Sequence, residues 1–100
     1  MTRKVVFSPE ARDDLFKLHS YIFDRGAPNA AIAYVTRLQA RCADLAAFPD
    51  QGMLRDEIRP GLRLLGFERR TQIAFHVTPD TVLIDRIFHG GQNVEASFDD

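Results

Sequence analysis

Cysteine is nearly absent from this 100-residue chain, since Cys42 is the only one. An intrachain disulfide needs two cysteines, so none can form, and a reducing cytoplasm is the compartment we expect. Long apolar runs are missing too. The run that follows Arg3 and Lys4 has only three residues, too few for a secretory signal or a membrane span. We therefore expect a soluble, cytoplasmic protein with no membrane partner.

An excess of either charge is also lacking. The 13 basic residues nearly balance the 14 acidic ones, for a net charge of −1, and only two of the basic residues are lysine. A protein whose main task is to hold nucleic-acid phosphates is usually clearly basic. We therefore expect no sequence-specific nucleic-acid binding by the chain alone. A local positive stripe remains open between Arg55 and Arg70, where five arginines face three acids.

The residues that bind metals or attack substrates are few and poorly placed. No histidine has a second ligand at a spacing that suits zinc, and we predict no metal site and no cofactor. Cys42 falls on the apolar face of an expected helix, where a buried structural thiol is the usual outcome. Gly90-Gly91 lacks the lysine or third glycine of a phosphate-binding loop. The histidines in question are His19, His76 and His89.

What is present is ordinary globular composition. Hydrophobic residues make up 45% of the chain and charged residues 27%, which argues against disorder. The length suits one domain over residues 1–100 with a modest core. Eight phenylalanines and no tryptophan indicate that phenylalanine packing supplies much of that core.

Two helices are predicted after a first strand at residues 3–7. Ser8 suits the N-cap and Pro9 the first helical position, while Gly26 ends the first helix. A second helix is expected from Pro28 to Ala47, and the short connection favours an antiparallel hairpin. Apolar residues recur at helical spacing on each: Ala11, Leu15, Leu18 and Ile22 on the first, and Ile32, Val35, Leu38, Cys42 and Leu45 on the second.

Three strands are predicted after the helix exit at Phe48-Pro49, at residues 62–67, 71–77 and 81–89. Thr78-Pro79-Asp80 is a tight reversal, so the last two strands should form a hairpin. The tail suits either a short helix or an extension of a strand edge. The fold class is therefore α+β: a two-helix antiparallel hairpin on a small, mainly antiparallel sheet, in the order β-α-α-β-β-β with a short C-terminal tail.

Arg86 is unusual because it lies in a strand that otherwise reads as core. Strict alternation groups Arg86 with Val82, Ile84 and Phe88, and groups His89 with Leu83, Asp85 and Ile87. An arginine in such a strand must find an acceptor or reach solvent. Two interpretations stay open: an ion pair with Asp85, Glu68 or a helix acid, or a side chain that projects toward the phosphate or carboxylate of a partner.

His89 and the arginines of the stripe also have two interpretations each. At the end of its strand, His89 suits either a general base or a polar cap. Arg63, Arg69 and Arg70 suit a solvated sheet edge, which discourages self-pairing, or an anion-binding patch beside Arg86.

The order of short motifs resembles the ParE toxins, within the RelE/ParE superfamily of type II toxin–antitoxin systems. The motifs that carry this resemblance are Phe7-Ser8-Pro9-Glu10-Ala11 with Asp13-Asp14-Leu15, Tyr21-Ile22, Leu45…Phe48-Pro49 with Gly52, Pro60-Gly61-Leu62-Arg63 and Ile84…Arg86…His89-Gly90. It covers almost the full length. The resemblance implies the same two-helix α+β fold and, as a tight partner, a ParD-like antitoxin whose C-terminal segment folds as it wraps the toxin. Characterised ParE toxins poison DNA gyrase.

Our leading hypothesis is therefore a non-enzymatic gyrase inhibitor that acts by protein–protein contact, with Arg63, Arg86 and His89 as target-binding residues. The alternative is a ribosome-dependent mRNA endoribonuclease of the RelE type. There, Arg63 and Arg86 would clamp phosphate and His89 would act as acid or base. The charge balance disfavours the nuclease. A third class is a toxin fold without toxicity that acts with its antitoxin in operator repression.

The antitoxin-binding surface is predicted on the first helix. Phe16, Tyr21 and Phe23 exceed what one core-facing stripe needs, and an amphipathic helix laid in an apolar groove is a common recognition mode. The same three aromatics would also suit a wider core stripe. Addition of an antitoxin strand to a sheet edge is a further route.

Overall fold

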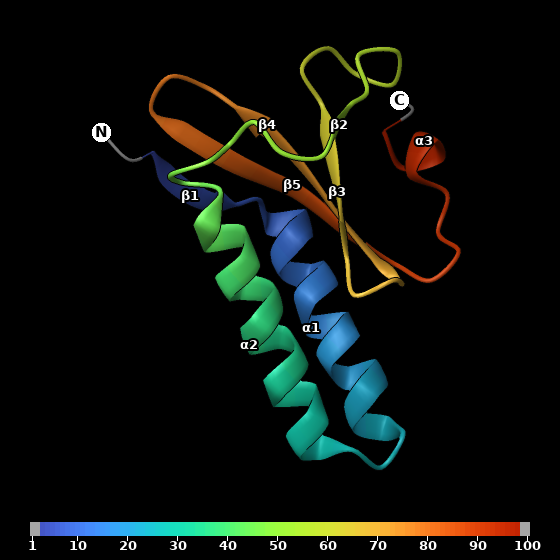
Figure 1. Cartoon of the computed structure of the whole chain (residues 1–100). Helices are drawn as coiled ribbons and strands as arrows, with labels where there is room; N and C mark the ends of the chain where they lie inside the picture. The colour runs from blue at the N-terminus through green and yellow to red at the C-terminus, as the bar shows by residue number, and fades with distance from the viewer. Residues whose placement is uncertain (1–2, 99–100) are drawn as a thin grey trace.

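A five-stranded sheet in the order β1-β5-β4-β3-β2 forms the centre of the molecule (Figure 1). The structure, a computed structural model, describes residues 3–98. β1 pairs with β5 in parallel, and the other neighbours are antiparallel. The predicted α+β fold is thus confirmed, with a two-residue strand, β2, that the sequence did not indicate. The strands are β1 (Lys4–Phe7), β2 (Met53–Leu54), β3 (Arg63–Phe67), β4 (Thr71–Val77) and β5 (Thr81–His89).

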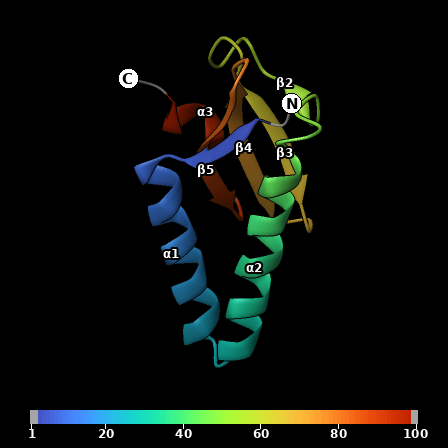
Figure 2. The same cartoon turned by 90° about the vertical axis from the view of Figure 1, so that its left-hand side faces the viewer.

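Helices α1 (Pro9–Asp24) and α2 (Pro28–Asp44) form the predicted antiparallel hairpin on one side of the sheet (Figures 1 and 2). Ser8 caps α1, because its Oγ accepts a hydrogen bond from the N–H of Ala11 at 2.9 Å. Gly26 then reverses the chain with a φ of +80°, a conformation that favours glycine. α2 ends at Asp44, three residues before the predicted Ala47.

The main core lies between this hairpin and the sheet. It includes Leu15 and Leu18 of α1, Leu38 and Cys42 of α2, and Phe75 of β4. Ile32 was predicted on the buried face of α2, and this prediction is wrong: its side chain is 60% exposed. Ile32 belongs to the first turns of α2, and that end of the hairpin projects past the sheet (Figures 1 and 2). Within residues 3–98, no strand lies there to cover it.

A bulge in β5 alters which residues share a sheet face. Phe75 of β4 pairs with Ile84, but the preceding Ala74 pairs with Arg86, so Asp85 has no partner in the ladder. Alternation restarts at Arg86. The predicted grouping of Arg86 with Ile84 is therefore wrong, because strict alternation cannot reveal an inserted residue.

The second face of the sheet carries a smaller apolar cluster of Leu62, Ala74 and Phe88. A short helix, α3 (Val94–Ser97), and the following Phe98 cover part of it. The Phe98 ring lies 6.0 Å from the Phe88 ring, centroid to centroid. Of the two alternatives for the tail, the helix is the one that forms.

Candidate functional site

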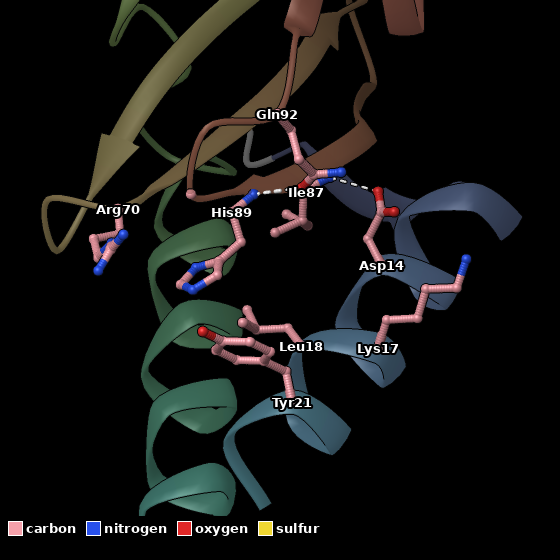
Figure 3. Close-up of a pocket in the computed structure, with 9 residues that line it drawn as sticks. Asp14, Lys17, Leu18, Tyr21, Arg70, Ile87, His89 and Gln92 are labelled. Atoms are coloured by element: carbon pink, nitrogen blue, oxygen red, sulfur yellow. Dashed lines mark hydrogen bonds between the residues drawn. The ribbon is translucent and has the colours of Figure 1, made fainter. Parts of the chain in front are cut away.

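A pocket of about 310 Å³ lies between α1 and the C-terminal end of β5. Lys17, Leu18 and Tyr21 reach it from α1, His89 from β5, and Arg70 from the turn before β4 (Figure 3). Elements distant in the sequence meet here because α1 packs along β5. The pocket combines an apolar base with basic groups at its rim, which is the make-up of a binding site.

Asp14 closes the edge of β5 beside this pocket. β1 ends at Phe7, so the edge of β5 beyond Ile84 has no strand neighbour on that side. Asp14 of α1 takes the place of a strand: its Oδ2 accepts a hydrogen bond from the N–H of Ile87 at 2.9 Å. The same carboxylate binds Arg86 through both oxygens, at 2.7 Å from Nε and 3.0 Å from Nη2. Of the two interpretations of Arg86, the ion pair with a helix acid is the one observed.

His89 is held by a chain of hydroxyl groups. Its Nδ1 lies 3.0 Å from Oγ1 of Thr71, which lies 2.6 Å from the hydroxyl of Tyr34. Thr71 is only 1% exposed, so the middle of this chain of hydrogen bonds is shielded from water. The ring of Tyr21 stands edge-on to the His89 ring at 5.7 Å. These contacts orient the imidazole, and Nε2 has no hydrogen-bond partner among residues 3–98.

The protonation of His89 is set by burial and by a neighbouring charge. Burial lowers the pKa of His89 below its ordinary value of 6.5, and the positive charge of Arg70 lowers it further. The lowered pKa favours the neutral imidazole at pH 7. In that state His89 can accept or donate a single hydrogen bond at Nε2, depending on its tautomer.

Arg63 lies apart from Arg86 and His89. It pairs across the sheet with Phe75, a core residue on the helix side, whereas Arg86 pairs with Ala74 of the other face. Its guanidinium binds the Asp50 carboxylate at 3.7 Å and the Gln51 carbonyl oxygen at 3.4 Å. The structure thus places the three predicted site residues in three different settings, and only His89 lines the pocket.

The three predicted antitoxin-binding aromatics are all exposed on α1. The exposed fractions are 71% for Phe16, 48% for Tyr21 and 51% for Phe23. Phe16 and Phe23 are two turns apart and lie on one flank of the helix, whereas Tyr21 is offset from Phe16 by about 140°. Tyr21 belongs to the pocket, and the guanidinium of Arg25 covers its ring at 4.3 Å. The three side chains are therefore not part of the core, and the alternative of a wider core stripe is wrong.

Metal-binding and nucleophilic groups contribute little within residues 3–98. No three residues among His, Cys, Asp and Glu in this part of the chain are close enough together to hold a metal ion. Cys42 is fully buried, and burial raises the pKa of its thiol to about 12. A thiol with that pKa stays protonated and inert at neutral pH. No helix in the same region is long and apolar enough to span a membrane.

Sequence reasoning did not assign Lys17, Arg70 or Tyr21 to one pocket with His89. Arg70 arrives there through a turn in which Glu68 and Arg69 adopt positive φ values of 46° and 71°. Non-glycine residues rarely do so, and no sequence signal marks them. Arg37 holds the turn, with two hydrogen bonds to the Glu68 carboxylate at 2.9 and 3.0 Å.

Solved structures share this fold. The chromosomal ParDE toxin–antitoxin system of Pseudomonas aeruginosa matches with a TM-score of 0.77 and 23% identity, over 89% of this chain and 97% of that one. The RelBE2 toxin–antitoxin complex of Mycobacterium tuberculosis matches with a TM-score of 0.56 and 21% identity, over 89% and 99%. The chain therefore has the fold of these two solved structures.

Sequence comparison identifies the family. The model of the ParE toxin of the type II toxin–antitoxin system parDE matches residues 5–94. Toxin ParE1 of Mycobacterium tuberculosis is 31% identical over 96 residues, which cover 95% of this chain and 97% of that toxin. Toxin ParE3 of Caulobacter vibrioides is 27% identical, over 93% and 92%. The chain belongs to the ParE toxin family of type II toxin–antitoxin systems.

Proposed function

We propose that this toxin inhibits DNA gyrase by protein–protein contact and that a ParD-like antitoxin neutralises it in the cytoplasm. The observation that carries the non-enzymatic part is the ion pair between Asp14 and Arg86. A phosphate clamp needs free guanidinium groups that converge on one point. Arg86 and Arg63 each bind a carboxylate of their own chain, on different faces of the sheet. The net charge of −1 supports the same conclusion.

We assign target binding to Arg63, Arg86 and His89, as the sequence predicted. The Arg63 side chain remains 23% exposed and that of Arg86 25% exposed, so each has donors left for a partner. His89 offers its Nε2 to the pocket. In this assignment the arginines present a fixed shape and charge to gyrase, and no bond is broken by the toxin.

We assign antitoxin binding to Phe16, Tyr21 and Phe23. Exposed aromatics of this size on one helix are typical anchors of protein interfaces. An antitoxin helix laid along α1 would bury Phe16 and Phe23, which otherwise stay in water at an unfavourable free energy of about 25 cal/mol per Å² of apolar surface.

The test is plasmid supercoiling by purified gyrase in the presence of the full chain. Inhibition that rises with toxin concentration, and is reversed by the antitoxin encoded with the chain, is the expected result. Full supercoiling activity in the presence of a demonstrably folded toxin would remove gyrase as the target.

The alternative function, mRNA cleavage on the ribosome, is favoured by one observation. The lowered pKa of His89 favours the neutral imidazole, and its Nε2 has no hydrogen-bond partner among residues 3–98. His89 also lies in a pocket with Arg70 and Lys17, as an acid–base residue would. Cell-free translation followed by primer extension decides this point. Cleaved message that disappears with His89→Ala supports the nuclease, and intact message at inhibitory toxin concentrations rejects it. A chain that is harmless in both assays would point to operator repression.

A further inference from the structure

The pocket beside His89 has an apolar floor. Leu18 and Ile87 are 4% and 2% exposed and form its floor, and the ring of Tyr21 stands at its side. A volume of about 310 Å³ is at the lower end of the range for ligand sites, about 300–1,000 Å³. This space suits one large apolar side chain better than a whole cofactor.

The rim of the pocket has more positive than negative charge. Lys17 and Arg70 line it, and Arg25 lies over Tyr21. The one carboxylate at the rim, Asp14, is committed to Arg86 and to the backbone of β5. Within residues 3–98, no carboxylate lies within 4.0 Å of the Arg70 guanidinium. The positive charges at the rim therefore favour a partner that carries acidic groups.

Lys17 remains available to an acidic partner although it forms an ion pair within the chain. It contacts Asp13 at 2.8 Å, but the two side chains are 74% and 56% exposed. Exposed pairs of this kind contribute about 0–1 kcal/mol and exchange readily for another acid.

A nucleic acid fits this arrangement poorly. Few cations surround the floor, and that floor is aliphatic, whereas a single strand is held by a track of basic groups with aromatic faces for its bases. An acidic peptide that carries an apolar side chain satisfies both the floor and the rim.

We propose that the pocket takes a large apolar side chain from an acidic segment of the antitoxin, with carboxylates of that segment on Arg70 and Lys17. This inference rests on the proposed function, since it names the chemistry of the partner that neutralises the toxin. It also divides the antitoxin surface in two: Phe16 and Phe23 on one flank of α1, and the Tyr21–His89 pocket on the other.

The first experiment is an NMR titration of the ¹⁵N-labelled full chain with N-acetyl-L-leucine, a small molecule that carries both a leucine side chain and a carboxylate. Its matched control is N-acetyl-L-leucinamide, which keeps the side chain and lacks the charge. We expect the amide signals of Leu18, Tyr21 and Gly90 to shift with the acid, and the neutral amide to bind about tenfold more weakly. Equal binding of the two compounds, or shifts elsewhere on the chain, would overturn the proposal.

The second experiment compares two neighbouring arginines in the full complex. Arg70 lines the pocket and Arg69 does not. R70Q should weaken binding of the antitoxin encoded with the chain by about tenfold or more, and R69Q should leave it within about twofold. Circular dichroism of both variants verifies the fold. Equal affinities for R70Q and R69Q would overturn the proposal.

Failure of this inference can be told apart from failure of the proposed function. If the chain inhibits gyrase but R70Q binds antitoxin as tightly as R69Q, only the pocket assignment is wrong. If N-acetyl-L-leucine binds at the pocket as described but gyrase is unaffected, the pocket assignment stands and the gyrase assignment is wrong.

Discussion

Asp14 on α1 holds Arg86 on β5 by both carboxylate oxygens, at 2.7 and 3.0 Å, and binds the N–H of Ile87 as well. One side chain thus completes the edge of the sheet and provides the counter-charge of Arg86. The hydrogen bond to Asp14 also raises the pKa of Arg86. The same contact stabilises the fold and occupies the Arg86 guanidinium.

Replacement of Asp14 by Asn should destabilise the protein by about 2–4 kcal/mol, because the Arg86 guanidinium loses its counter-charge in a largely buried position. Asp13→Asn is the matched control: it removes only the exposed pair with Lys17 and should cost less than about 0.5 kcal/mol. Urea unfolding followed by circular dichroism measures both. Equal losses for the two variants would show that the Asp14 contact contributes little.

Gly52 lies so close to the backbone of Leu64 that any side chain at this position would clash. A Cβ on Gly52 would lie 2.3 Å from the carbonyl oxygen of Leu64, and its φ is +76°. Gly52→Ala should therefore lower stability by about 2 kcal/mol or more. Gly66→Ala is the control, since a Cβ there meets nothing within 4 Å and the backbone is ordinary. Thermal unfolding of the pair gives the comparison, and a G52A midpoint equal to that of G66A contradicts it.

His89 should titrate below pH 6.5 in the folded protein, with burial as the larger cause and Arg70 as the smaller. Arg70→Gln should raise the pKa of His89 without restoring 6.5, and Arg69→Gln should not change it. Ring-proton shifts measured against pH report these values. A folded pKa at or above 6.5 would contradict the structure.

The lowered pKa of His89 should also make the stability of the protein depend on pH. The unfolded chain binds a proton at His89 more readily than the folded chain does. Stabilisation from His89 is therefore full above pH 6.5 and is lost as the pH falls from about 6.5 through the folded pKa. His89→Gln should flatten this part of the pH profile. A profile identical to that of the parent chain would be the contrary result.

The thiol of Cys42 should react with a disulfide reagent only when the protein unfolds. It is fully buried with a pKa of about 12, so at pH 8 almost none of it is thiolate. The reaction should be slow in buffer and complete within minutes in denaturant. Rapid labelling of the native protein would mean that α2 leaves the core easily.

Phe16→Ala and Phe23→Ala should each weaken antitoxin binding by about tenfold or more, as expected of aromatic interface anchors. Phe48→Ala is the control, because Phe48 is similarly exposed, at 70%, but follows α2 at the opposite end of the hairpin. Isothermal titration calorimetry gives the affinities. A loss for Phe48→Ala as large as for the other two would place the groove elsewhere.

Local signals in the sequence were enough for most of the fold. Ser8, Pro9, Gly26 and Pro28 mark helix ends through capping and φ preferences that need no tertiary context. The alternation in Thr71–Val77 likewise reports a strand with one face on the core.

Features that depend on contacts between distant segments could not be predicted from the sequence. The bulge at Asp85 inserts a residue without any change in composition, and it moved Arg86 to the other face. The parallel pairing of β1 with β5 depends on the whole chain path. The pocket depended on both, and on the left-handed turn that brings Arg70 to His89. His89, Tyr21 and Arg70 were singled out beforehand, each for a different role.

The most direct test of the gyrase assignment is the recovery of cleaved plasmid. Supercoiled plasmid, gyrase and ATP are incubated with the purified toxin, then treated with detergent and protease and resolved on a gel. We predict linear plasmid that requires both gyrase and toxin and disappears when the antitoxin is added. Unbroken plasmid at every concentration of a folded toxin would contradict it.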